Sequence, residues 1–105
     1  MSLASADVII VTGSFLARSD TVDELVRLSL EHVHRSRAEP GCLLHSVHRD
    51  VEEPLRLVFL EHWEDADALA AHFHVPAAVE FATALRGLAA ERPHLAVYDA
   101  NPITI

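Results

Sequence analysis

The sequence predicts a single α+β domain of ferredoxin-like type, in which a four-stranded antiparallel sheet carries its helices on one face. Segments with strand and helix patterns follow one another along the chain in the order β-α-β-β-α-β. The length of 105 residues is enough for one hydrophobic core and too short for two. We therefore assign residues 1–105 to one domain, with a loose N-terminus over residues 1–6 and a C-terminal tail over residues 101–105.

The first three strands are predicted from β-branched and alternating apolar runs. The run Val8-Ile-Ile-Val11 extends toward Phe15 and lacks polar alternation, which is typical of a strand covered on both faces. Residues 42–49 and 55–63 form the second and third strands, and the polar turn 50–54 joins them as an antiparallel hairpin.

The third strand has apolar residues on both faces. Strict alternation places on one face Leu57, Phe59, Glu61 and Trp63. It places on the other face Val58, Leu60 and His62. Helices on one side cannot cover both faces, so the pattern predicts that a second copy of the sheet covers the other face in a homodimer.

The first helix is predicted to run from Thr21 to about Arg37. Thr21 followed by Glu24 is a capping-box signature, and apolar residues recur at helical spacing after it. The pair Pro40-Gly41 ends the segment, because Pro disfavours helix in the residue before it and Gly supplies a left-handed turn.

The second helical region begins at Asp65, whose side chain is a good N-cap. Pro76 permits a restart rather than an unbroken helix, so we expect a break near residues 74–76. Residues 94–100 form the last strand.

Charge and composition exclude several classes of partner. The formal net charge of -8 repels phosphate backbones and anionic lipid heads, so neither nucleic acid nor a membrane is an expected partner. The absence of a visible secretion signal predicts a cytoplasmic location. Cys42 is the single cysteine and is interpreted as a small buried hydrophobe.

The segment Glu61-His-Trp63-Glu-Asp-Ala-Asp-Ala-Leu69-Ala-Ala-His72 is the most informative stretch of the chain. It resembles the E-x-W-x-(D/S)-x-x-x-L-x-x-H run of the antibiotic biosynthesis monooxygenase family, and the segment 39–42 and Phe81 also look like that family. The resemblance implies a dimeric α+β barrel and a quinol monooxygenase-like activity. It further implies that a small quinol or phenolic substrate reacts with molecular oxygen without metal, haem or flavin.

The same residues suggest a chemistry. His72 follows the strand that bears Glu61 and Trp63 by about two helical turns, so its imidazole can fold back over the indole. His72 would then be the base that deprotonates the substrate, Glu61 would orient the imidazole or hold a hydroxyl, and Trp63 would stack on the substrate. The further candidates for lining the cavity are Phe59, Phe73, Phe81 and His45.

Structural roles for these residues remain open at this point. Trp63 can be a core residue, Glu61 can accept structural hydrogen bonds, and His72 can cap its helix before the Pro76 break. The eight histidines invite a metal hypothesis, but no metal-binding motif occurs and histidine pairs close in sequence diverge in space, so we expect no metal site.

Two other functions also fit the sequence. One is an isomerase acting on a small hydroxy-carbonyl compound, with His72 and Glu61 moving protons in the absence of oxygen. The other is a non-enzymatic dimeric module that binds a ligand or responds to stress. Oxygen consumption separates the first alternative from the monooxygenase, and turnover separates the second from both enzymes.

Overall fold

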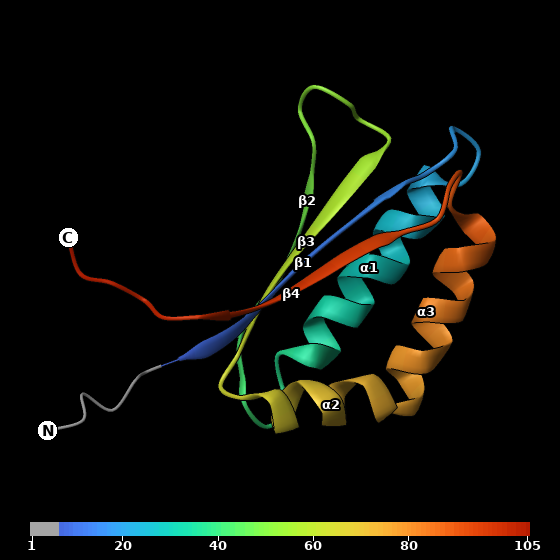
Figure 1. Cartoon of the computed structure of the whole chain (residues 1–105). Coiled ribbons are helices and arrows are strands. Elements are labelled where there is room, and N and C mark those ends of the chain that lie inside the picture. The colour runs from blue at the N-terminus through green and yellow to red at the C-terminus, as the bar shows by residue number, and fades with distance from the viewer. Residues whose placement is uncertain (1–6) are drawn as a thin grey trace, which may run out of the picture.

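The computed structural model describes residues 7–105, and the predicted loose segment 1–6 lies outside this range. The chain forms one α+β unit (Figure 1). Its elements, in chain order, are β1 (Val8–Leu16), α1 (Val22–Ser36), β2 (Cys42–Arg49), β3 (Arg56–Trp63), α2 (Ala66–His74), α3 (Pro76–Leu88) and β4 (His94–Ala100). The predicted ferredoxin-like fold class is confirmed, with the second helical region divided into two helices.

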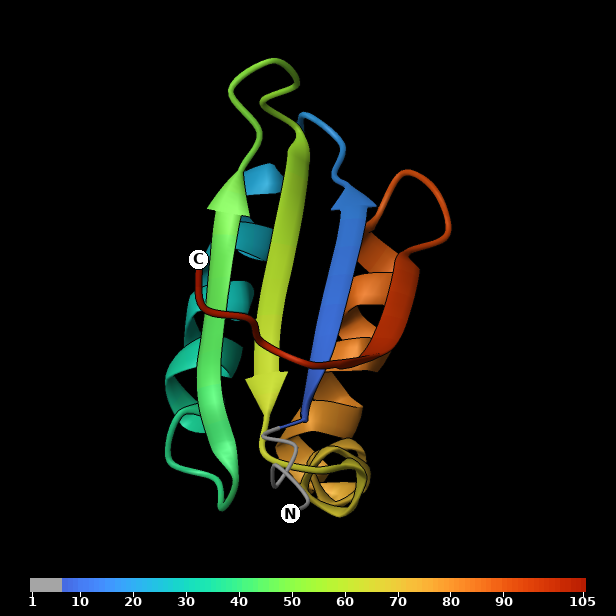
Figure 2. The same cartoon turned by 60° about the vertical axis from the view of Figure 1, so that its left-hand side comes forward.

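The four strands form one antiparallel sheet in the order β2-β3-β1-β4. The three helices of residues 7–105 lie on the same face of this sheet, and within these residues the other face carries no helix (Figures 1 and 2). In the register of the sheet, Glu61 of β3 lies opposite Val11 on one side and His45 on the other. Glu61 and His45 are therefore neighbours on the face that the helices cover.

The alternation predicted for β3 is confirmed. The residues of β3 that face the helices are all buried, namely Leu57, Phe59, Glu61 and Trp63. The remaining residues of β3 point to the open face and are only half-buried. A core of Phe15, Leu25, Phe59 and their neighbours fills one end of the sheet-helix layer, and Val11, Trp63 and Leu69 pack at the other end.

The break between α2 and α3 occurs where Pro76 predicts it. Val75 is extended between the two helices, whose axes differ in direction by 72°. Pro76 fits the start of α3 because the first helical residue needs no backbone N–H. Within residues 7–105 no single helix is long and apolar enough to cross a membrane, although α2 and α3 taken as a bent pair have the length and composition to do so.

The start of α1 differs from the predicted capping box. Thr21 makes no side-chain bond to the first turn of the helix. Its hydroxyl instead donates to the carbonyl of Leu88 at 2.8 Å and accepts from the backbone N–H of Arg18 at 3.0 Å. Glu24 pairs with Arg27 on the helix surface. The Thr21 side chain therefore ties the start of α1 to the end of α3. At α2, the predicted Asp65 cap is confirmed, because its carboxylate accepts from Ala68 N–H at 2.8 Å.

Candidate active site

A cavity of about 450 Å³ lies between the sheet and the helices. Residues of β1, β3 and the helices α1, α2 and α3 form its wall, together with the start of β4 and the segment that leads into it. Much of the wall is apolar and includes Phe59, Phe81 and Leu85. A volume of this size accommodates a small aromatic molecule.

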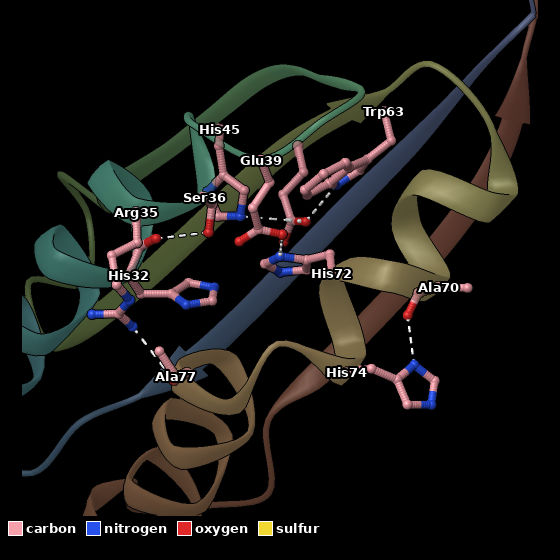
Figure 3. Close-up of polar contacts among 11 residues, drawn as sticks. His32, Arg35, Ser36, Glu39, His45, Trp63, Ala70, His72, His74 and Ala77 are labelled. Carbon is pink, nitrogen blue, oxygen red and sulfur yellow. Dashed lines mark hydrogen bonds and ion pairs between the residues drawn. The ribbon is translucent and has the colours of Figure 1, made fainter.

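His72 presents an imidazole in the cavity wall. It is 3% exposed, and its Nδ1 lies 2.8 Å from Oε1 of Glu39 (Figure 3). Because a carboxylate accepts hydrogen bonds, the imidazole donates from Nδ1, and in the neutral ring this leaves the lone pair on Nε2. The predicted alternative, that the His72 side chain caps α2, is wrong, because its ring bonds Glu39. It is Nδ1 of His74 that donates to a carbonyl of the helix, that of Ala70.

Glu61 lies on the same wall and is held by two neighbours. The indole N–H of Trp63 donates to Oε1 of Glu61 at 2.8 Å, and Nε2 of His45 lies 3.4 Å from the same oxygen without the geometry of a hydrogen bond. Burial raises the pKa of Glu61, but His45 and the Trp63 N–H more than offset it, so the net pKa of this carboxyl lies below its ordinary value. Glu61 is therefore ionised at neutral pH.

His32 of α1 completes the polar end of the cavity. Its ring stacks on Phe81 with centroids 4.2 Å apart and planes 11° from parallel. Burial, together with the nearby His45 and His72, lowers the pKa of His32 to about 3. His32 is therefore a neutral imidazole at physiological pH.

The structure brings together most of the predicted site residues. Those that line the cavity are His72, Glu61, Phe59, Phe73 and Phe81. His45 and Trp63 lie outside the wall. Trp63 is fully buried, with its ring 4.7 Å from that of His72, so it supports the imidazole and the Glu61 carboxylate rather than offering a face to a ligand.

Sequence reasoning missed Glu39, His32 and two arginines of this site. Glu39 belongs to the segment 39–42 that supported the family resemblance, and that segment was the available signal for it. His32 has no motif, because it joins the site only through the packing of α1. Arg86 and Arg92 line the cavity at positions that no sequence pattern marks.

The chain matches the family model "Antibiotic biosynthesis monooxygenase" over residues 8–84. It is 33% identical over 92 residues to the uncharacterised protein sll1783 of Synechocystis sp., covering 88% of this chain and 63% of that protein's length. The chain therefore spans less than two thirds of this relative.

Solved structures show the same fold. One is a candidate antibiotic biosynthesis monooxygenase from Deinococcus radiodurans, with a TM-score of 0.88, 26% identity, and coverage of 92% of this chain and 96% of that one. Another is a conserved protein from Methanosarcina mazei, with a TM-score of 0.86, 22% identity, and coverage of 94% and 98%. Because the family model matches residues 8–84, which are most of the chain, the chain belongs to the antibiotic biosynthesis monooxygenase family.

Proposed function

We propose that the protein is a monooxygenase that oxidises a small quinol or phenol with molecular oxygen and without a cofactor, using His72 as the base. The observation that carries the proposal is the hydrogen bond between His72 and Glu39 at the wall of an apolar cavity. It gives a buried imidazole with a fixed tautomer beside a space of the right size for an aromatic ring.

The electron balance of this reaction needs only the substrate and oxygen. A hydroquinone and one O₂ yield a hydroxyquinone and one water, so the substrate supplies all the electrons. Nε2 of His72 would take the phenolic proton, because the phenolate transfers electrons to oxygen far more readily than the neutral phenol. The apolar side chains Phe59 and Phe81 would keep water away from the aromatic anion.

The proposal includes a homodimer joined through the open face of the sheet. This face carries half-buried apolar side chains such as Ile10 and Leu60, and none of the helices in the described part of the chain covers it (Figure 2). The C-terminal tail leaves the sheet on this side, away from the helices (Figure 1), and its Ile103 and Ile105 are exposed. A second copy would bury both features.

An isomerase acting on a small anionic hydroxy-carbonyl compound is the second candidate. Arg86 and Arg92 line the same cavity as His72, and guanidinium groups suit a phosphate or carboxylate on the substrate. The same imidazole would then move a proton between neighbouring carbons, and no oxygen would be consumed.

The deciding experiment measures oxygen uptake by chelator-treated protein given a panel of hydroquinones and anthrols. We expect uptake that persists with chelator and falls by about 10²- to 10⁴-fold in His72→Ala, the usual contribution of a general base. The matched control is His74→Ala, which removes an exposed imidazole from the same helix and should leave the rate unchanged. A wild-type rate equal to that of buffer across the panel would refute the monooxygenase and leave the isomerase and the binding module.

A further inference from the structure

Three histidine side chains from three different elements meet beside the cavity, where His32 and His72 line the wall and His45 lies behind it. His32 comes from α1, His45 from β2 and His72 from α2 (Figure 3). Their ring centroids are separated by 5.2, 5.3 and 5.5 Å, so they form a nearly equilateral triangle. One nitrogen from each ring lies within 4.8 Å of the other two.

The polar atoms of this triangle are incompletely satisfied by the protein. Both ring nitrogens of His45 are buried and have no hydrogen-bond partner among the described residues. Leaving a buried polar group unpaired costs on the order of 1–3 kcal/mol, so such groups normally have a partner. A ligand from outside the chain at the centre of the triangle would remove this cost.

The surroundings of the triangle are those of a cation site. Glu39 accepts a hydrogen bond from Nδ1 of His72 and so orients the ring, as carboxylates do behind metal-ligating histidines. The ionised Glu61 lies 3.4 Å from Nε2 of His45 and contributes negative charge beside the triangle. His32, Glu61 and His72 line the cavity, so a position on the cavity side is open to a small molecule.

The geometry points to a binding site for one divalent transition-metal ion, with His32, His45 and His72 as protein ligands and a fourth position open to the cavity. Imidazole nitrogens suit Zn²⁺, Co²⁺, Ni²⁺ and Cu²⁺. Zn–N bonds of about 2.0–2.1 Å in tetrahedral geometry set ligand nitrogens roughly 3.4 Å apart. Closing the triangle from 4.8 Å requires movements of about an ångström, which small ring rotations can supply.

This site does not depend on the proposed oxygenation, although the two share His72. A metal ion bound to Nε2 of His72 takes the lone pair that a base needs. A protein with both properties therefore has a metal-free form with a free base and a metal-bound form without one. We therefore expect the rate of oxygen uptake to fall when a metal ion is added to the metal-free protein.

The test is a titration of the untagged, chelator-treated protein with Co²⁺ in the absence of any aromatic substrate. We expect one Co²⁺ per chain, the intense visible absorption of a four-coordinate complex, displacement by Zn²⁺ and a higher Tm. His32→Phe and His72→Phe should lose the absorption, and His32→Phe keeps an aromatic ring against Phe81. His34→Ala removes an exposed histidine of the same helix and should bind Co²⁺ as the wild type does.

The His45→Cys variant distinguishes loss of metal binding from failure to fold. A thiolate ligand adds a sulfur-to-cobalt charge-transfer band, so a folded His45→Cys protein should gain this new signal. The proposal is overturned if the folded wild type takes up no Co²⁺, or if His32→Phe and His72→Phe bind it as the wild type does. Oxygen uptake is measured separately with chelator, so failure of metal binding and failure of the proposed function give different results.

Discussion

Nδ1 of His72 in α2 lies 2.8 Å from Oε1 of Glu39, a residue 33 positions earlier in the chain that precedes β2. The bond joins two elements that only the tertiary fold brings together. Since an ionised carboxylate can only accept, the contact selects the tautomer in which Nε2 carries the lone pair. Glu39 thus acts as a positioning residue for the imidazole that is proposed as the base.

The first prediction concerns this positioning role. Glu39→Gln keeps the side-chain size but removes the charge that holds the His72 tautomer, so we expect kcat for oxygen uptake to fall roughly 10- to 100-fold with little change in KM. Glu39→Asp should restore part of the rate. Glu52→Gln, at an exposed position of the β2–β3 turn, is the control and should behave as the wild type. An equal loss in both Gln variants would argue against positioning by Glu39.

The fold was largely predictable because the spacing of apolar residues and the positions of proline and glycine determine it. Leu57, Phe59 and Trp63 alternate on β3 as the sequence indicates, and Pro76 marks the break between α2 and α3. The start of α1 was less predictable. The Thr21 hydroxyl could cap its own helix or bond a distant carbonyl. Packing against the end of α3 places it within hydrogen-bond distance of the carbonyl of Leu88.

The candidate site was predictable only where its residues lie near one another in the chain. Glu61, Trp63 and His72 occur in one motif, and the structure brings their side chains together. The triangle formed by His32, His45 and His72 has no sequence signature, because each ring comes from a separate element. Spacing along the chain excluded metal ligation by histidine pairs close in sequence, but it carries no information about histidines joined by packing.

The second prediction concerns the turn that supports Glu39. Gly41 has φ of 81°, and a Cβ at this position would lie 2.5 Å from Cβ of Ala68. We expect Gly41→Ala to lower the free energy of unfolding by about 1–3 kcal/mol through backbone strain and this clash. Urea denaturation measures the loss, and oxygen uptake should also fall because the turn leads directly from Glu39.

Gly87 provides the matched control for Gly41. It lies in α3, and a Cβ there would meet nothing within 4 Å. Gly87→Ala should raise the free energy of unfolding by about 0.5–1 kcal/mol, because alanine favours helix over glycine. Equal changes in the free energy of unfolding for the two substitutions would mean that the turn at Gly41 has no special need for glycine.

The third prediction is a pH dependence of stability in the metal-free protein. The folded pKa of His32 is about 3, whereas the unfolded chain titrates near the ordinary value of 6.5. Below about pH 6.5 the unfolded state binds more protons, so the free energy of unfolding should fall by roughly 1.4 kcal/mol per pH unit. The charged and titratable groups that face His32 are His45, His72, Glu61 and Arg35.

The contribution of His32 is isolated by comparison with His32→Phe. This variant keeps the stack on Phe81 and removes the titrating group. Urea denaturation with chelator, from about pH 7 to about pH 5, should therefore give a shallower slope for His32→Phe than for the wild type. Parallel slopes in the two proteins would show that His32 is not the residue held neutral by burial.

The fourth prediction tests the dimer through the centre of the open sheet face. Leu60 lies opposite Thr12 of β1 and Ser46 of β2, on the side away from the helices. We expect Leu60→Arg to shift the sedimentation mass from dimer to monomer while the far-ultraviolet spectrum is retained, because a buried charge destabilises an interface more than an isolated sheet face. Val51→Arg places the same charge at a turn residue that is 95% exposed and should leave the dimer intact. Pairing through this face is contradicted if the wild-type protein sediments as a monomer, or if the Leu60→Arg protein still sediments as a dimer. In either case the half-buried apolar residues of this face would be exposed to solvent.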